Sequence, residues 1–394
     1  MLYATGAMGI TAINQLGRFL SLVIVALGMD LVWGYAGILS LCQAMFFCFG
    51  GYAIGMYLAL HGPLDGNGVP TALSVVSSTV GGIKLPWFWK PFASFPSAIL
   101  LGMLVTGGFA FVFGYFTFRS RVRGVYFSII TQALTVALLN VFRLNDIKLC
   151  GTNGLTNFVT ILGYDLRSPA TQVGLYLATS LAVIASYLGC RWLVGTRLGR
   201  LLKAVRDNES RLRFAGFQPV TFKIFVFLLG ALMAAVGGML YTPQNGIITP
   251  SKMEAVESIT IVAFVAVGGR GTLTGAVIGA LVVSYLNSLL TSGFFYGLLP
   301  GFLRMPADGV AQSAILFYMR RPLQILLGAD GWLFVLGGIF VGITLFMPQG
   351  IVGAWRRLLS HGRTGVAAAV EEDADRAHAE EGSVDSSAVQ EVRV

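Results

Sequence analysis

The sequence predicts an all-α polytopic membrane protein with about eight or nine transmembrane helices. Of its 394 residues, 55% are hydrophobic and 11% are charged, and the mean hydropathy is +0.75. Soluble domains carry about 25% charged residues, so a chain this poor in charge would not stay soluble as a monomer. The 50 glycines agree with this class, because small residues let membrane helices approach closely.

Nine apolar runs supply the predicted helices. A transmembrane helix needs about 20 mostly apolar residues. The seventh run is the weakest, since Ile259–Val267 is its only strongly apolar core, and we expect the first two helices to be separated at Gly34–Gly37. The runs cover residues 16–35, 38–60, 96–118, 125–142, 173–194, 224–243, 254–269, 274–291 and 331–348.

The positions of Lys and Arg predict the orientation in the membrane. One group of loops holds 15 basic residues in 59 positions, and the other group holds nine in 114 positions. Cytoplasmic loops carry the excess of basic residues, so the first group is predicted to be cytoplasmic, which places the C-terminus inside and residue 1 outside. The first group comprises 119–124, 191–223, 268–273 and 350–363; the second comprises 61–95, 143–172, 244–253 and 292–330.

The chain divides into a transmembrane domain over 1–355 and a cytoplasmic acidic tail over 356–394, which we expect to be disordered. Within the domain, the extracytoplasmic connection 292–330 mixes apolar pieces with arginines and forms either an interfacial helix pair or one more span. The net charge of +9 rises to +15 without residues 371–394. Because the basic excess lies in short loops between apolar runs, topology explains it and no nucleic-acid partner is expected.

Motifs for catalysis and for cofactor binding are absent from the sequence. It contains no G-x-x-x-x-G-K-[ST] loop for ATP, no H-E-x-x-H and no G-x-S-x-G, and its four cysteines lack metal-ligand spacing. We therefore expect neither an enzyme nor a metal or cofactor in this chain. Within the predicted spans only Asp30 is both charged and deep, and we expect it to pair with another helix near the cytoplasmic side.

A basic amphipathic segment over 196–216 is the most informative cytoplasmic stretch. Its leucines and Val205 form one helical stripe, and the capping pattern at Asp207 predicts two short helices joined there. Either this segment lies on lipid as an anchor, or it docks in a groove of a partner ATPase. Under the second interpretation the ATPase-coupling residues are Arg197, Gly199, Arg200, Ala204, Arg206, Asp207, Asn208 and Glu209.

A glycine-rich stretch over 265–280 predicts a tight helical hairpin. Gly268, Gly269 and Gly271 permit a sharp turn, and Gly275 and Gly279 give the following helix a flat face for close packing. A nucleotide-binding glycine loop is disfavoured because no strand precedes it.

Polar residues within the predicted spans share one helix face. Ser128, Thr131, Gln132 and Thr135 follow i, i+3, i+4, i+7 spacing, and Gln43 lies in the second span. Polar groups are costly against hydrocarbon, so this face should look inward. It either forms hydrogen bonds between helices or lines a path for a neutral polar solute.

Several segments together resemble a known family, the branched-chain amino acid and urea class of ABC importer permeases. The resemblance covers roughly residues 16–355, and within the class the urea branch is the most similar. The class-wide segments are Met29–Leu41 (MDLVWGYAGILSL), Phe46–Leu58, Gly195–Arg200, Ala204–Glu209, Val267–Thr272 and Met347–Gly353; those typical of the urea branch are Leu85–Trp89 (LPWFW), Arg119–Ala133, Gly154–Asn157 and Tyr241–Pro250.

The resemblance implies a subunit of an importer in the bacterial inner membrane. It implies a second homologous permease subunit, two cytoplasmic ABC ATPases that bind the ATP, a periplasmic solute-binding protein, and urea or short amides as the solute. The family segment LSLGHGAFF reads LSLCQAMFF at Leu39–Phe47, a departure that bears on solute preference. Alternative hypotheses are branched-chain amino acid import, a passive channel or secondary carrier, and a membrane enzyme, the last disfavoured by the missing catalytic cluster.

Overall fold

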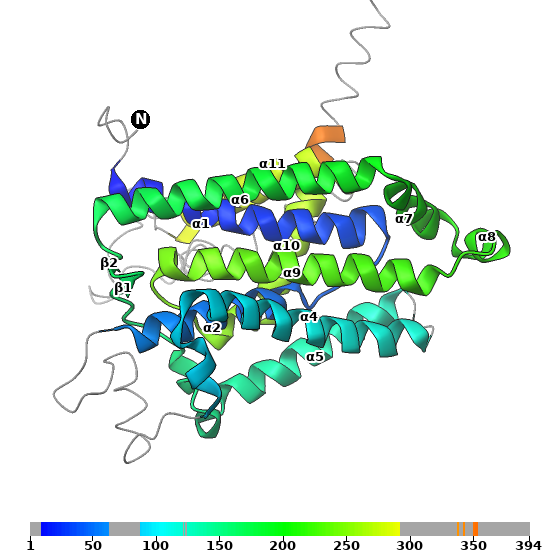
Figure 1. Ribbon diagram of the computed structural model, residues 1–394. Helices are drawn as coiled ribbons and strands as arrows, with labels where there is room; N and C mark the ends of the chain where they lie inside the picture. The colour runs from blue at the N-terminus through cyan, green and yellow to red at the C-terminus, as the bar shows by residue number, and fades with distance from the viewer. Residues whose placement is uncertain are drawn as a thin grey trace, which may run out of the picture.

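The computed structural model describes residues 9–62, 87–120, 122, 124–291, 337–338, 342 and 350–353. Long helices run side by side along one direction, with α7 and α8 at one end and the β1–β2 hairpin at the other (Figure 1). The predicted span 331–348 lies almost wholly outside the described residues. The connection 292–330 and the tail 356–394 lie entirely outside them.

Eight of the nine predicted runs fold into helices, although the second helix begins at Gln43 and not at residue 38 as predicted. Six helices in the described part are long and apolar enough to cross a membrane, and α10 and α11 are shorter apolar helices, so the all-α polytopic class is confirmed. The first helix continues as a π-helix, η1 (Asp30–Tyr35). The bounds are α1 Ile10–Met29, α2 Gln43–Leu60, α4 Phe95–Arg119, α5 Val125–Arg143, α6 Pro169–Gly195, α9 Pro219–Asn245, α10 Ala255–Gly268 and α11 Leu273–Thr291.

Short elements connect these helices. Between α6 and α9 lie α7 (Arg197–Asp207) and α8 (Glu209–Phe214), which are the two short helices predicted to meet near Asp207. Asn208 caps α8, since its side chain accepts a hydrogen bond from the Arg211 N–H at 3.1 Å. The remaining elements are η2 Trp87–Ala93, η3 Asn145–Ile147, η4 Gly151–Asn153, η5 Pro250–Met253 and the antiparallel strands β1 Thr160–Ile161 and β2 Tyr164–Asp165.

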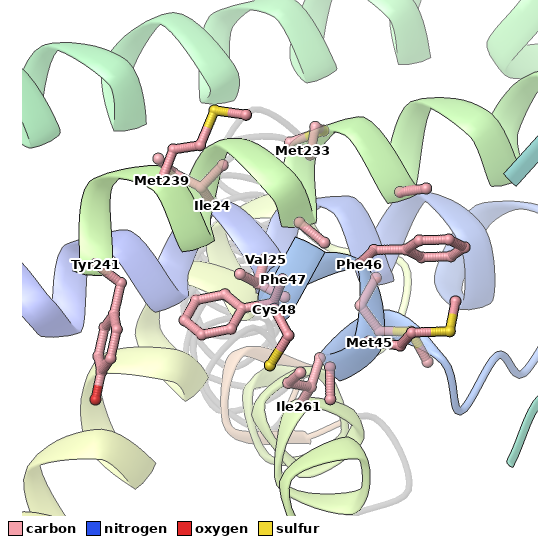
Figure 2. Close-up of a cluster of buried hydrophobic side chains, with 14 of the residues drawn as sticks. Ile24, Val25, Met45, Phe46, Phe47, Cys48, Met233, Met239, Tyr241 and Ile261 are labelled. Atoms are coloured by element: carbon pink, nitrogen blue, oxygen red, sulfur yellow. The ribbon is translucent and has the colours of Figure 1, made fainter. Parts of the chain in front are cut away.

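Burial separates central helices from outer ones. The most apolar window of α2 is 89% buried within the chain, whereas the corresponding window of α6 is 11% buried. Apolar side chains of α2 pack with those of α1, α9 and α10 in the core, where the rings of Phe47 and Tyr241 meet edge to face at 5.2 Å between centroids (Figure 2). Since the apolar residues of α4, α5 and α6 point outward, these three helices present the faces suited to lipid.

The loops sort to the two ends of the bundle as the count of basic residues predicted. At one end, here called the basic end, residues 118–120, 122, 124, 205–223 and 269–272 come together around η1. At the opposite end, Leu155 and Ile248 form an isolated β-bridge, and the Thr160 hydroxyl donates to the carbonyl of His61 at 2.7 Å.

Candidate functional site

The π-helix η1 is the meeting point of three segments at the basic end. Its i→i+5 pattern is shown by the Ala36 N–H, which donates to the carbonyl of Leu31 at 3.3 Å. Arg206 of α7 donates to the carbonyl of Gly34 at 2.9 Å. Arg270, in the turn between α10 and α11, donates to the carbonyl of Trp33 at 3.2 Å. Two guanidinium groups therefore tie α7 and the α10–α11 turn to the end of the first span.

Arg270 is further held by the aromatic ring beside it. Its guanidinium carbon lies 4.9 Å from the centroid of Trp33, within the range of a cation–π contact. Burial and the neighbouring Arg206 charge lower the pKa of Arg270, while Asp30 opposes this effect. An arginine remains charged under such conditions, so the turn carries a permanent cation next to η1.

Asp30 is fully buried at the start of η1, and its partner is backbone. Its Oδ1 accepts a hydrogen bond from the N–H of Gly271 at 2.7 Å, so it contacts the α10–α11 turn near the basic end. A Cβ added to Gly34 would lie 2.0 Å from that oxygen and 2.6 Å from the Gly271 nitrogen. Only glycine at 34 therefore leaves room for this bond.

The apolar stripe of the basic segment packs within its own chain. Leu202, Val205 and Leu212 are buried. The sequence analysis considered that this stripe docks in a groove of a partner ATPase. In the structure, the stripe instead packs α7 and α8 against the helix bundle.

The predicted coupling residues fall into two groups. Gly199 is buried, Ala204 is half-buried, and Glu209 forms ion pairs with Arg213 at 2.7 Å and Lys223 at 2.9 Å. These three residues therefore hold the segment's own structure. The residues that face solvent are Arg197, Arg200, Arg206, Asp207 and Asn208.

Phe214, which the sequence analysis did not single out, is the most exposed large apolar residue of the described part. It ends α8 and is 92% exposed, at the tip that projects furthest from the bundle in Figure 1. A bare aromatic ring on a projecting tip is the kind of residue that anchors a protein interface. The sequence signal was present, because Phe214 directly follows Arg213 and stands two residues after Leu212, the last member of the apolar stripe.

The polar stripe of α5 contacts the irregular segment between η1 and α2. Ser128 donates to the carbonyl of Leu39 at 2.8 Å, and the Leu41 N–H donates to the Thr131 hydroxyl at 3.1 Å. Thr135 donates to the carbonyl of Leu41 at 3.4 Å. These bonds satisfy backbone groups that lack a helical partner.

The two glutamines of the predicted pathway behave differently from the hydroxyl residues. Gln43 is buried at the start of α2, and both its amide atoms lack a hydrogen-bond partner among the described residues. The amide atoms of Gln132 are buried and lack a partner in the same part of the chain. Ser128, Thr131 and Thr135 therefore hold the irregular segment by hydrogen bonds. The side-chain amides of Gln43 and Gln132 have no hydrogen-bond partner among the described residues.

The glycine-rich stretch forms the sharp turn between α10 and α11. Gly269 and Gly271 have φ values of 122° and 76°, conformations that side chains other than glycine rarely adopt. A Cβ on Gly268 would lie 1.8 Å from the carbonyl oxygen of Gly275, and one on Gly279 would lie 2.0 Å from that of Phe264. The two helices thus touch through their backbones.

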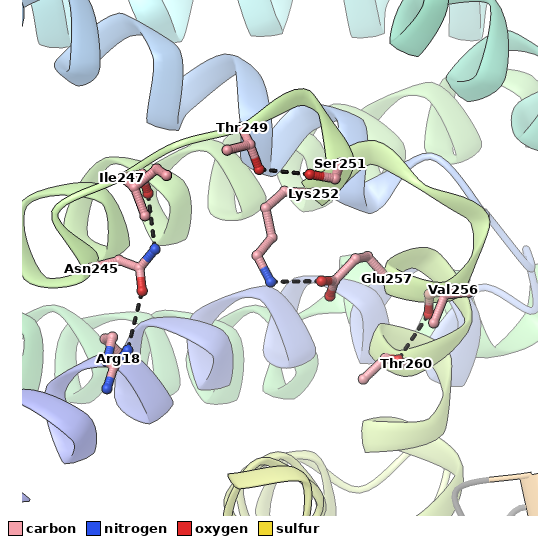
Figure 3. Close-up of polar contacts among 9 residues, drawn as sticks. All are labelled: Arg18, Asn245, Ile247, Thr249, Ser251, Lys252, Val256, Glu257 and Thr260. Carbon is pink, nitrogen blue, oxygen red and sulfur yellow. Dashed lines mark hydrogen bonds and ion pairs between the residues drawn. The ribbon is translucent and has the colours of Figure 1, made fainter. Parts of the chain in front are cut away.

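A polar cavity of about 230 Å³ opens between α1, α10 and α11 towards the opposite end. In Figure 3 Lys252 of η5 points at Glu257 of α10, and their Nζ and Oε1 atoms are 2.6 Å apart. Arg18 of α1 donates to the side-chain oxygen of Asn245 at 3.1 Å. None of the predicted pathway residues borders this cavity, although Ala44 next to Gln43 does.

The sequence analysis missed this site because Lys252 stands in a ten-residue loop between two spans. The signal that could have found it is the spacing of Lys252 and Glu257, with Pro250 starting a helical turn before α10. A loop that folds back onto the span end brings the two charges together.

Helices that are long and apolar enough to cross a membrane, with basic loops gathered at one end, define a multi-pass membrane protein. Residues 11–319 match the family described as branched-chain amino acid transport system / permease component, and the chain belongs to this family of ABC-type permeases. No solved structure matches the chain.

The chain is similar to permeases whose names refer to different solutes. The high-affinity branched-chain amino acid transport system permease protein LivM is 25% identical over 301 residues in Escherichia coli and 23% over 300 in Salmonella typhimurium. Each alignment covers 70% of this chain and 63% of the relative, so the chain spans less than two thirds of those proteins. The ribose import permease protein RbsC of Haemophilus influenzae is 26% identical, with 68% of this chain and 73% of that protein covered.

Proposed function

We propose that this chain is the membrane-spanning permease subunit of an ATP-driven importer in the bacterial inner membrane. It works with a second homologous permease subunit, two cytoplasmic ATPases that bind the ATP, and a periplasmic solute-binding protein. The basic end and the C-terminus face the cytoplasm. Membership of the permease family and the basic residues at one end support this assembly.

The observation that carries the proposal is the construction of α7 and α8. The segment presents Phe214 and exposed charges outward, while Arg206 bonds it to the π-helix that ends the first span. A partner that moves this segment therefore pulls on α1 directly. A lipid anchor would instead bury its apolar stripe in the membrane, but this stripe is already packed within the chain.

The docking role is tested with the assembled complex in vesicles. Phe214→Ala should weaken ATPase binding by about 30-fold, because an anchoring aromatic at the centre of an interface contributes about 2 kcal/mol. Phe116→Ala is the matched control, since Phe116 is 65% exposed on the outer face of α4. Equal ATPase binding by the two variants would exclude the tip as a docking point.

A charge reversal tests the same segment independently of Phe214. Arg200→Glu combined with Arg206→Glu should abolish ATP-dependent uptake while leaving membrane insertion intact. Unchanged uptake would refute the docking role. Uptake without any nucleotide hydrolysis would favour a passive channel or secondary carrier instead.

For the solute, we propose urea or a short amide. The segments typical of the urea branch support this choice, and the unpartnered amides of Gln43 and Gln132 suit an uncharged solute. Branched-chain amino acids are the second candidate, favoured by the names of the LivM relatives. Uptake of labelled urea compared with labelled leucine decides between the two.

A further inference from the structure

We propose that the cavity between α1, α10 and α11 is a binding site for a small uncharged polar solute, and that the Lys252–Glu257 pair closes it to charged ones. This deepens the proposed function and rests on it. No residue of the predicted stripe on α5 lines the site, and the residues that do line it come from six elements: α1, α2, α9, η5, α10 and α11.

The size of the cavity fits a solute of a few heavy atoms. Its volume is about 230 Å³, whereas one water occupies about 30 Å³ of liquid. Its wall has an apolar part that includes Phe19 and Phe47 and a polar part that includes Gln15 and Asn287. Such a mixture of apolar walls and a small number of polar groups is typical of small-molecule sites.

Two buried polar groups at the cavity lack a partner in the described structure. Ser284 of α11 borders the cavity, is 5% exposed, and its hydroxyl forms no hydrogen bond. The Nε of Arg18 is likewise buried without an acceptor, although Nη1 of the same side chain bonds Asn245. A donor left unsatisfied in a polar cavity calls for a ligand acceptor, such as the carbonyl oxygen of urea or an amide.

The remaining two charges neutralise each other. Burial alone would lower the pKa of Lys252, but Glu257 and Tyr241 raise it above its ordinary value, so Lys252 stays a cation bound to its partner. The ammonium also lies 6.0 Å from the ring centroid of Tyr241. A zwitterion could place its carboxylate at Arg18, but its ammonium group would have to displace Lys252 from Glu257 to find a counter-charge, whereas an uncharged amide binds beside the pair.

Cysteine labelling tests occupancy of the cavity. In the full complex, Ser284→Cys is placed in a chain whose native Cys42, Cys48, Cys150 and Cys190 are replaced by alanine. Methyl methanethiosulfonate, a small neutral reagent, should modify this cysteine, and urea should slow the modification at least fivefold while leucine does not. Ser258→Cys is the matched control, because Ser258 of α10 is also buried with an unpartnered hydroxyl but does not border the cavity.

Each outcome of the labelling bears on the proposal. Modification of Ser284→Cys that urea does not slow would overturn it, as would no modification at all, since the cavity would then be closed to solutes. Protection by leucine equal to that by urea would refute the exclusion of charged solutes. The labelling needs no ATP, so it remains decisive even if the wild-type complex fails to show ATP-dependent uptake, which would count against the proposed function alone.

A second test keeps the native cysteines and changes only the ion pair. Glu257→Gln leaves the Lys252 charge uncompensated next to Arg18, so acetate should inhibit urea uptake about tenfold more strongly than in the wild type. The double variant Lys252→Met with Glu257→Gln should return to wild-type insensitivity. A purely structural pair would lower the amount of folded protein without creating anion inhibition, and that result would overturn the proposal.

Discussion

The contact between α10 and α11 leads to a quantitative prediction at Gly279. A Cβ at this position would lie 2.0 Å from the carbonyl oxygen of Phe264 and 2.7 Å from the nitrogen of Gly268. Ordinary contacts begin at 3.4 Å. Gly279→Ala must therefore push the two helix backbones apart by roughly 1.4 Å, because backbone atoms cannot rotate aside as a side chain does.

The magnitude follows from comparison with a glycine in open space. Gly189 lies on the outer face of α6, where an added Cβ meets nothing within 4 Å. Both substitutions gain about 0.5–1 kcal/mol because alanine favours the helix over glycine. The difference between the two variants therefore isolates the cost of overpacking, about 1–3 kcal/mol.

The assay is reversible unfolding of the purified chain in mixed micelles, followed by far-ultraviolet circular dichroism. We expect Gly189→Ala to be slightly more stable than the wild type and Gly279→Ala to be less stable than Gly189→Ala by the amount above. If both variants unfold at the same denaturant fraction, α10 and α11 do not touch through their backbones, and the close packing of the hairpin is wrong.

Three further substitutions separate packing from transport. Thr131→Val keeps the side-chain shape but removes the acceptor of the Leu41 N–H, so it should lower the unfolding free energy by about 1–3 kcal/mol in the same assay. Gln132→Leu should impair solute uptake with little change in stability if α5 lines the path; normal uptake would leave the stripe a packing feature. Gly34→Ala should break the bond between Asp30 and Gly271 and reduce uptake per ATP hydrolysed, and an unchanged ratio would remove η1 from the transport cycle.

Helix positions were predictable because the requirement for about 20 apolar residues acts on each span separately. The predicted runs 96–118 and 125–142 correspond to Phe95–Arg119 and Val125–Arg143. The grouping of loops at two ends was also predictable, since consecutive spans alternate in direction. Both properties depend on local composition alone.

Features that depend on tertiary contacts were not predictable. The sequence of Asp30–Tyr35 does not distinguish a π-helix from an α-helix. In the structure, two carbonyl groups of this π-helix accept hydrogen bonds from Arg206 and Arg270, which are distant in sequence. The stripe around Leu202 was read as a docking face because helical periodicity shows that a face is apolar but not which neighbour covers it. The cavity with Lys252 and Glu257 needed the fold of η5 against α10.

The exposure of Phe214 has a consequence for the amount of this chain that a cell keeps relative to its partner subunits. A chain synthesised in excess over its partners keeps this ring in water, as it does the exposed ring of Phe217. Chaperones and membrane proteases select clients by such bare apolar side chains. We therefore expect surplus copies to be degraded rapidly, and the cell to hold its subunits in fixed proportion without separate control of each one's synthesis.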